Sequence, residues 1–210
     1  MLTIYHVPRS RSLRITWLME ELGEDYALET MPMPIPAEFR EINPLGCVPT
    51  IEDPDHADGP IRMFESLAIM QYITGRRLVA GDEKAAALTV GPRPDPAAYA
   101  EHLQFLHFGE ADLTGPIGSL FRARRFGVED NPTLSESKAF LARRIGFLDG
   151  HLSDGRTWVT GEQFTIADIS IGYAFSLAEL GRLDLDLPAH VAGYWRRLQE
   201  RPAYQRAFAK

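Results

Sequence analysis

The stretch NPLGCVPTI, residues 43–51, narrows the fold more than any other part of this sequence. It places Pro49 at the start of a β-like run that continues to Asp53. A proline removes one donor from a strand ladder, so it belongs at a sheet edge or at a kink. Two conformations are open for the bond between Val48 and Pro49. It is an ordinary trans bond, or it is cis and turns the Val48 N–H and C=O outward to pair with an extended, peptide-like ligand.

A second motif, FESLAI at residues 64–69, lies at a predicted strand-to-helix junction. Ser66 is a natural N-cap, and the first amides of a helix together with its dipole attract a carboxylate. The neighbouring carboxylate of Glu65 would attract an ammonium group. Two interpretations therefore stand: plain helix capping beside a solvated glutamate, or a site for the α-amino acid end of a ligand.

Around these motifs, the first eighty residues alternate between strand-like and helix-like segments. Strand-like runs occupy residues 2–6, 25–31, 48–53 and 61–65. Apolar residues at helical spacing predict helices over 12–22 and from 66 to about Gly75, with Gly23 as a helix stop. A helical crossover predicts that the first two strands are parallel, and the loop at 53–60 predicts an antiparallel last pair. The predicted order is βαβ followed by ββα.

The rest of the chain has helical patterns only. Residues 81–95 are rich in proline and glycine and predict a linker. Helices are predicted over 97–121 with a break at Gly115-Pro116, and over 134–152, 164–181, 188–199 and 203–209. The expected domains are residues 1–80, an α/β unit, and residues 96–210, an all-helical unit.

Composition excludes several classes of function. The net charge of -7 argues against nucleic-acid binding. No apolar run is long enough to span a bilayer, and the first residues lack the order of a signal peptide, so we expect a cytoplasmic protein without membrane contact. The lone Cys47 excludes an intrachain disulfide, and the six histidines, His56 among them, show no metal-ligand spacing, so no metal is expected. P-loop, Rossmann and serine-hydrolase motifs are absent.

The segment RSRSLR, residues 9–14, puts two serines where the first strand gives way to the first helix. The net charge of -7 of the whole chain argues against nucleic acid as a partner of this segment, and nothing in the sequence favours phosphorylation. The remaining interpretation is a helix start that binds an anion or a thiolate. Ser12 lies nearer the helix and is the natural N-cap, while Arg11 is a solvated side chain or a local source of positive charge.

These motifs together resemble the cytosolic glutathione S-transferases over the whole chain. NPLGCVPTIED is similar to NPxGxVPxLxD of that family, and ESLAIMQYI is similar to ESxAIxxYL. FTIADISIGY is similar to the motif of the helical domain, where Thr165 and Asp168 form a capping box. The openings SRSLRITWLMEELG and LQFLHFGEADL look most like the bacterial and fungal branch with a serine-type N-terminus. The resemblance implies a thioredoxin-like α/β N-terminal domain followed by an all-α C-terminal domain.

The resemblance also implies a glutathione site. The Val48 backbone would pair with the cysteinyl part of glutathione, with Pro49 cis, while Glu65 and Ser66 would hold the γ-glutamyl end. Cys47 stands next to the place of the glycine carboxylate, where the family often has a lysine or another polar residue. Cys47 is then a small side chain at a loop edge, or a residue that forms a mixed disulfide with glutathione.

The implied chemistry is stabilisation of the glutathione thiolate by a serine hydroxyl. The family's SRxxR pattern favours Ser10, with Ser12 as the alternative. Phe105, Phe108 and Asp112 would contribute to a pocket for a small hydrophobic electrophile. The expected function is a homodimeric, detoxifying transferase that uses glutathione as co-substrate and no cofactor. A glutathione-dependent peroxidase or disulfide-bond reductase, and a non-catalytic transferase-like binding module, are the alternatives.

Overall fold

The computed structural model describes residues 1–54, 59–128 and 132–210. They divide into two compact units, one of residues 1–86 together with 202–210, and one of residues 87–201. The middle of the predicted 53–60 loop, with His56, lies outside the described residues, as do residues 129–131. No helix in the described part of the chain is both long and apolar enough to cross a membrane.

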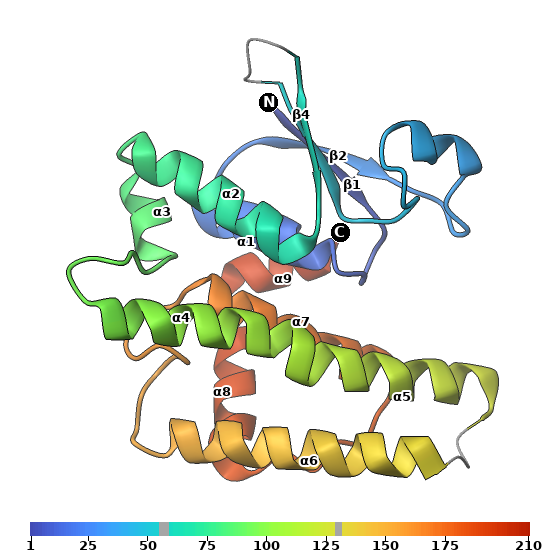
Figure 1. Cartoon of the computed structure of the whole chain (residues 1–210), viewed down its shortest axis with the longest axis vertical. Helices are drawn as coiled ribbons and strands as arrows, with labels where there is room; N and C mark the ends of the chain where they lie inside the picture. The colour runs from blue at the N-terminus through green and yellow to red at the C-terminus, as the bar shows by residue number, and fades with distance from the viewer. Residues whose placement is uncertain (55–58, 129–131) are drawn as a thin grey trace. The chain divides into compact units, whose positions relative to one another are not determined.

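The first unit contains a four-stranded mixed sheet in the order β2-β1-β3-β4 (Figure 1). The strands are β1 (Leu2–His6), β2 (Tyr26–Thr30), β3 (Thr50–Asp53) and β4 (Ile61–Phe64). β1 runs parallel to β2, and β3 is antiparallel to both β1 and β4. The predicted βαβ and ββα order, with its strand directions, is confirmed.

Helices lie on both faces of this sheet. α1 (Leu13–Leu22) and α2 (Ser66–Val79) lie on one face of the sheet in Figure 1. Ile4 and His6, which alternate with Tyr5 along β1, are buried. The 3₁₀ helix η1 (Ala37–Glu41) lies on the other face, where the Phe39 ring is 5.1 Å from the Tyr5 ring. α1 ends at Gly23 in the left-handed conformation, with φ 70°, as predicted. α2 continues beyond Gly75, its predicted end, since a single glycine weakens a helix without stopping it.

The last helix, α9 (Pro202–Phe208), belongs to the first unit, in contrast to the predicted 96–210 helical domain. Tyr204 packs edge-on against Trp17 of α1 at 4.8 Å. Glu20 of α1 accepts hydrogen bonds from Arg206 Nε and Lys210 Nζ, both at 2.6 Å. A short amphipathic helix carries no sequence signal of which unit it packs against, and here aromatic and charged contacts to α1 decide.

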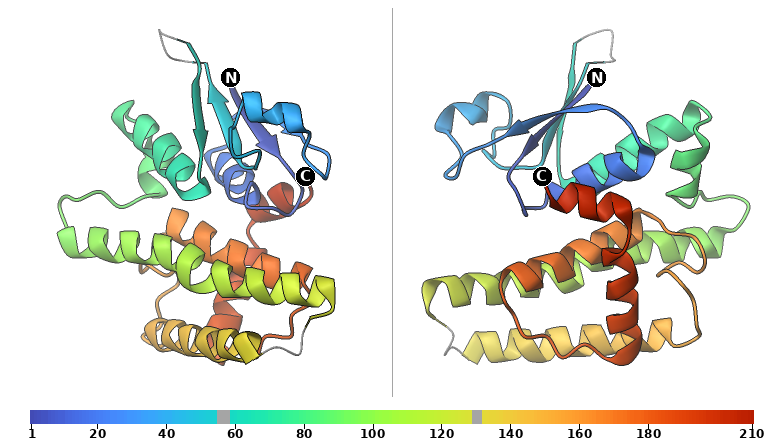
Figure 2. Two further views of the ribbon diagram at one scale, coloured as in Figure 1. Left: turned by 45° about the vertical axis from the view of Figure 1, so that its right-hand side comes forward. Right: turned by 180° about the vertical axis from the view of Figure 1, so that it is seen from behind.

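The second unit is helical. Its elements are α4 (Pro96–Phe108), the π-helix η2 (Gly109–Thr114), α5 (Gly115–Phe126), α6 (Pro132–Leu152), α7 (Ile166–Leu180) and α8 (Ala189–Gln199) (Figure 2). A short helix, α3 (Glu83–Ala87), occupies part of the predicted 81–95 linker. Asp82 begins α3, since its side chain accepts from the amides of Lys84 and Ala85. The predicted all-helical nature of the unit is confirmed.

α7 is the buried centre of the helical unit, and its start carries the predicted capping box. The Thr165 N–H donates to Asp168 Oδ2 at 2.8 Å, and Thr165 Oγ1 accepts from the Ala167 N–H at 3.3 Å. Asp168 Oδ1 also accepts from the Val159 N–H at 2.9 Å and from the Tyr194 hydroxyl at 2.8 Å. Burial raises the pKa of Asp168 to about 6. Asp168 thus joins α7, α8 and the loop before α7.

The predicted break in the long 97–121 helix begins earlier than Gly115-Pro116. The chain changes from α-helix to π-helix at Gly109, and Thr114 Oγ1 donates to the Gly109 carbonyl at 2.7 Å. Pro116 then lies in the first turn of α5, directly after the π-helix. The glycine explains the early change, because α7 crosses very close to it.

Gly109→Ala is expected to lower the free energy of unfolding by about 2 kcal/mol or more, because overpacking a tight helix contact forces the backbone apart. An added Cβ would lie 2.5 Å from Ser170 Oγ and 2.7 Å from the Ile171 nitrogen. Gly118→Ala on α5 is the matched control, since its Cβ would meet only the Arg122 guanidinium at 3.6 Å. Urea denaturation of both variants measures the difference, and equal stabilities would contradict the close-approach account.

Candidate functional site

The turn between β1 and α1 joins two serine hydroxyls to a buried histidine. Ser10 Oγ lies 2.7 Å from Ser12 Oγ, and Ser12 Oγ lies 2.8 Å from His6 Nδ1. His6 and Ser12 have no exposed surface, whereas Ser10 is half-buried. Of the two predicted candidates, Ser10 is therefore the hydroxyl that a ligand can reach.

Ser12 holds the N-cap position of α1, but its side chain makes no capping hydrogen bond. This corrects the expectation that the Ser12 hydroxyl caps the helix. The hydroxyl is occupied by His6, by Ser10 and by the backbone of Val7, whose N–H donates to it at 3.3 Å. The first helix amides are thereby left without a side-chain cap from Ser12.

Ser66 is the first residue of α2, and the N-cap is Glu65, whose side chain makes no capping hydrogen bond. This corrects the prediction that Ser66 is the cap. Glu65 has φ 74°, a conformation that costs a residue with a side chain about 1–3 kcal/mol and that is found mostly at functional sites. The Glu65 side chain is exposed, and Ser66 is buried.

Arg14 of α1 connects the serine turn to α2; the sequence predicted only a local positive charge from the arginines of residues 9–14, without a partner for Arg14. Its side chain has no exposed surface, and Nη1 donates to Ser66 Oγ at 3.1 Å. A guanidinium stays charged even when buried, so Arg14 supplies a permanent positive charge beneath both helix starts. The signal in the sequence was an arginine on the apolar face of an amphipathic helix, three residues before Trp17.

The loop before β3 has the cis bond between Val48 and Pro49. Within the described residues, the Val48 N–H and C=O have no hydrogen-bond partner. The buried Asn43 shapes this loop, since its Nδ2 donates to the Cys47 carbonyl at 2.9 Å and to Thr50 Oγ1 at 3.0 Å. Cys47 itself is exposed. Asn43 was a missed residue, although it opens the quoted NPLGCVPTI motif.

Strand pairing brings these three segments to one end of the sheet. Tyr5 near the end of β1 pairs with Thr50 at the start of β3, and Thr50 pairs with Phe64 at the end of β4. The serine turn follows β1, the Val48-Pro49 bond precedes β3, and Glu65 follows β4. The site therefore combines a reachable hydroxyl, an unpaired backbone edge and a buried positive charge.

The residues predicted for a second substrate lie in the helical unit. Phe105 has no exposed surface, and its ring lies 4.2 Å from the His151 ring and 5.8 Å from the Phe108 ring. Phe108 is also buried, and Asp112 accepts a hydrogen bond from Arg144 Nε at 2.7 Å. Phe105 is thus part of the aromatic packing between α4 and α6.

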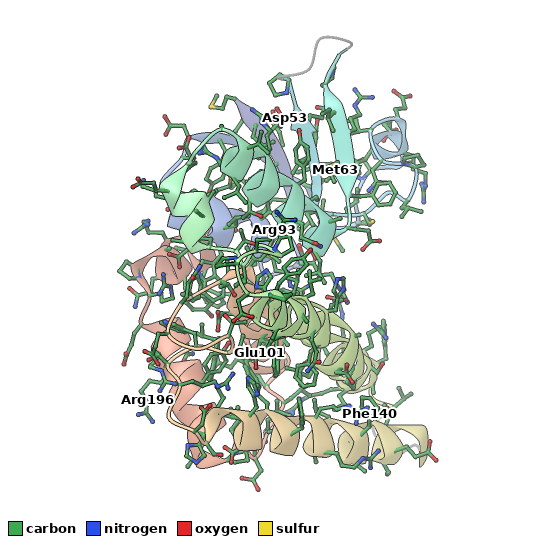
Figure 3. All side chains as sticks on the ribbon, turned by 60° about the vertical axis from the view of Figure 1, so that its left-hand side comes forward. Asp53, Met63, Arg93, Glu101, Phe140 and Arg196 are labelled. Carbon is green, nitrogen blue, oxygen red and sulfur yellow. The ribbon has the colours of Figure 1, made fainter. Side chains whose placement is uncertain are left out.

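A pocket of about 300 Å³ in the first unit contains none of the predicted site residues. Asp53, labelled in Figure 3, accepts hydrogen bonds there from the Tyr72 hydroxyl at 2.8 Å and from Arg76. These groups satisfy one another, so the pocket gives no reason to move the site. The described residues also contain no group of three or more His, Cys, Asp or Glu that would hold a metal ion.

Comparison with known proteins gives consistent results. Residues 9–76 match the family model of the glutathione S-transferase N-terminal domain. Glutathione S-transferase 3 of Schizosaccharomyces pombe is 25% identical, with 100% of this chain and 88% of the relative covered. The disulfide-bond oxidoreductase YfcG of Escherichia coli is 26% identical, with 100% and 95% covered.

Among solved structures, a glutathione transferase of Pseudomonas putida with one glutathione disulfide bound per subunit has a TM-score of 0.83. It is 26% identical, and the alignment covers 99% of this chain and 90% of that chain. Residues 9–76 are therefore similar to the N-terminal domain of glutathione S-transferases, and the whole chain is similar in sequence and fold to glutathione transferases.

Proposed function

We propose that the sheet end formed by the serine turn, the Val48-Pro49 bond and the Glu65-Ser66 junction binds glutathione, and that Ser10 donates a hydrogen bond to its thiolate. In this proposal the protein belongs to the serine-type branch of the glutathione S-transferases. The observation that carries the proposal is the strand register, which gathers these three segments at one end of the sheet with Ser10 as the reachable hydroxyl.

The Val48 backbone receives the peptide part of glutathione. Its N–H and C=O are unpaired within the described residues, so they offer an amide donor and acceptor to an extended ligand without breaking any existing bond. Cys47 beside it is exposed and lies near the glycine end in this binding mode. It brings no positive charge to the glycine carboxylate, so affinity must come from the other contacts.

The Glu65-Ser66 junction receives the γ-glutamyl end. The α2 amides at Ser66 and the nearby Arg14 guanidinium favour the carboxylate, and the exposed Glu65 carboxylate favours the ammonium group. Each charge of the amino acid end thereby meets an opposite charge. The left-handed conformation of Glu65 directs the chain into α2 at this point.

Formation of the thiolate requires a change of roughly 2.7 kcal/mol if the thiol pKa falls by about 2 units from its usual 8.5. A hydrogen bond from Ser10 to a charged sulfur contributes about 1.5–3 kcal/mol, and the positive end of the α1 dipole contributes about 0.3–1 kcal/mol more. Together these two contributions are large enough to lower the thiol pKa by about 2 units. No covalent intermediate with the protein is needed.

The thiolate then attacks a small hydrophobic electrophile, so that a carbon–sulfur bond forms and the leaving group departs. Phe108 and Asp112 remain the predicted contributors to the electrophile pocket, with Phe105 behind them as packing. The homodimer, the cytoplasmic location and the absence of a cofactor besides the co-substrate are parts of the same proposal.

A second candidate function is glutathione-dependent reduction of disulfide bonds. It is favoured by the full-length similarity to the disulfide-bond oxidoreductase of Escherichia coli. The purified protein should be assayed with an aryl halide, a hydroperoxide and a mixed disulfide of glutathione. Turnover of the aryl halide supports conjugation, turnover of only the other two supports redox chemistry, and no retention on glutathione resin with no turnover contradicts both.

Asn43→Ala is expected to raise the dissociation constant for glutathione about tenfold, because the loop that presents Val48 loses the hydrogen bonds to the Cys47 carbonyl and to Thr50. Turnover at saturating glutathione should change much less, since Ser10 is untouched. Calorimetric titration measures the affinity. Gln163→Ala, whose side chain bonds backbone carbonyls in the helical unit, is the control and should bind as the unaltered protein does.

A further inference from the structure

We propose that Arg40 supplies the positive charge for the glycine carboxylate of glutathione, a charge that Cys47 does not bring to this place. This inference rests on the proposed function and adds a residue that the sequence did not single out. It follows from the way in which the Arg40 side chain lies against the loop that presents Val48.

The backbone of Arg40 is fixed by the short helix η1. The neighbouring Phe39 is buried, and its ring packs 5.1 Å from the Tyr5 ring, which holds η1 on the sheet. The Asn43 N–H donates to the Phe39 carbonyl at 2.9 Å, so a backbone hydrogen bond ties η1 to the loop before β3. The Arg40 side chain therefore starts from a defined position directly before that loop.

The Arg40 side chain lies over Gly46 in this loop. A Cβ added at Gly46 would be 3.4 Å from Arg40 Cγ, 3.5 Å from Nε and 3.6 Å from Cζ. Gly46 has φ 61°, and its N–H donates to the Asn43 carbonyl at 2.8 Å, so a left-handed turn presents backbone without a side chain to the arginine. The guanidinium is thereby placed beside the residue that precedes Cys47.

The charge of Arg40 is not used within the described part of the protein. Arg40 is exposed, and it makes no hydrogen bond or ion pair with any residue that the structure describes. The exposed Glu38 and Glu41 of the same short helix are therefore not its partners. The guanidinium lies against the loop and remains available to an anionic ligand.

A guanidinium at this place matches the glycine end of glutathione. In the proposed binding mode the peptide part of glutathione pairs with the Val48 backbone, and its glycine carboxylate lies near Cys47. A planar guanidinium offers two parallel N–H donors to a carboxylate, and its charge strengthens both hydrogen bonds. The thiol of Cys47 offers only a weak donor. Arg40 thus provides the contact that the loop residue lacks.

The test compares two ligands that differ only at this carboxylate, glutathione and its glycine ethyl ester. Calorimetric titration of the unaltered protein should give a dissociation constant about tenfold lower for glutathione, since the ester carries no charge at that end. Arg40→Ala should weaken glutathione about tenfold and change the ester by less than about twofold, so that the two ligands bind alike. Arg40→Lys should keep part of the preference, because it retains the charge without the bidentate geometry.

Two further variants sharpen the test. Arg125→Ala removes an exposed arginine of the helical unit that also has no partner among the described residues, and it should leave both dissociation constants unchanged. The double variant with Arg40→Ala and Cys47→Lys returns a positive charge to the loop. Most of the preference for glutathione over the ester should therefore return with it.

The outcomes separate this role of Arg40 from the proposed function. If Arg40→Ala keeps the preference for glutathione, or weakens both ligands equally, Arg40 does not contact the glycine carboxylate, and the inference is overturned while the glutathione site stands. If the unaltered protein binds neither ligand, the proposed function fails and the role of Arg40 fails with it. A preference that vanishes in Arg40→Ala and returns in the double variant supports both.

Discussion

Ser10→Ala is expected to lower glutathione-dependent turnover by about 10- to 100-fold, since it removes a hydrogen bond to a charged sulfur worth about 1.5–3 kcal/mol. The loss should appear in kcat/KM, and it should shrink at high pH, where the thiol of glutathione ionises without help. Steady-state rates between pH of about 6 and 9 measure both effects, because this range spans the free thiol pKa of about 8.5.

Ser12→Ala is the informative comparison, because Ser12 has no exposed surface and acts only through Ser10. Its loss should be clearly smaller than that of Ser10→Ala. Ser153→Ala, a change at an exposed serine of the helical unit, serves as the control and should leave the rate unaltered. Equal losses for Ser10 and Ser12, or a larger loss for Ser12, would contradict the assignment of Ser10 as the donor.

Asp168→Asn is expected to lower the free energy of unfolding by about 3 kcal/mol at neutral pH, the cost of leaving buried donors unpaired. The carboxylate accepts from the amides of Thr165 and Val159 and from the Tyr194 hydroxyl. An asparagine offers one oxygen, and its NH₂ group must face one of these donors. Asp186→Asn, at an exposed aspartate, is the control and should unfold as the unaltered protein does.

The pH dependence of this effect has a definite sign. Burial raises the pKa of Asp168 to about 6, above its unfolded value of about 3.9, so the folded state binds the proton more tightly. The protonated Asp168 carboxyl therefore adds roughly 3 kcal/mol to the free energy of unfolding below a pH of about 3.9. This contribution is lost as the pH rises through about 6. Urea denaturation should therefore show that the difference in free energy of unfolding between the unaltered protein and Asp168→Asn becomes smaller as the pH rises from about 4.5 to about 7. A difference that grows with pH would show that the hydrogen bonds to the charged carboxylate of Asp168 outweigh the effect of its burial.

The fold was predictable from the sequence wherever the spacing of apolar residues agrees with the residues that begin or end an element. The strands at 2–6 and 61–65, the stop at Gly23 and the Thr165–Asp168 capping box all rest on local chemistry, and the structure has each of them. The compact unit to which α9 belongs could not be predicted from the sequence. That depends on contacts of Arg206 and Lys210 with Glu20, which are far away along the chain.

For the candidate site, the sequence pointed to segments that strand pairing brings to one end of the sheet, but not to the hydrogen bonds within them. Ser12 and Ser66 both looked like caps, because serine before an apolar helix usually caps it. In the structure, Ser12 bonds His6 and Ser66 bonds Arg14, and both partners are buried. The arginine on an apolar helix face signals a buried charge, but neither it nor the lone histidine in a strand indicates its serine partner, since only the fold brings them together.

The most direct test of the account is the pKa of the thiol of glutathione bound to the unaltered protein. The ultraviolet absorbance of the thiolate, followed with pH in the presence of saturating protein, reports that value. The account predicts half-ionisation near pH 6.5, about 2 units below the usual thiol value, and a return toward about 8.5 in Ser10→Ala. Half-ionisation near pH 8.5 in the unaltered protein, or no saturable binding of glutathione, would contradict it.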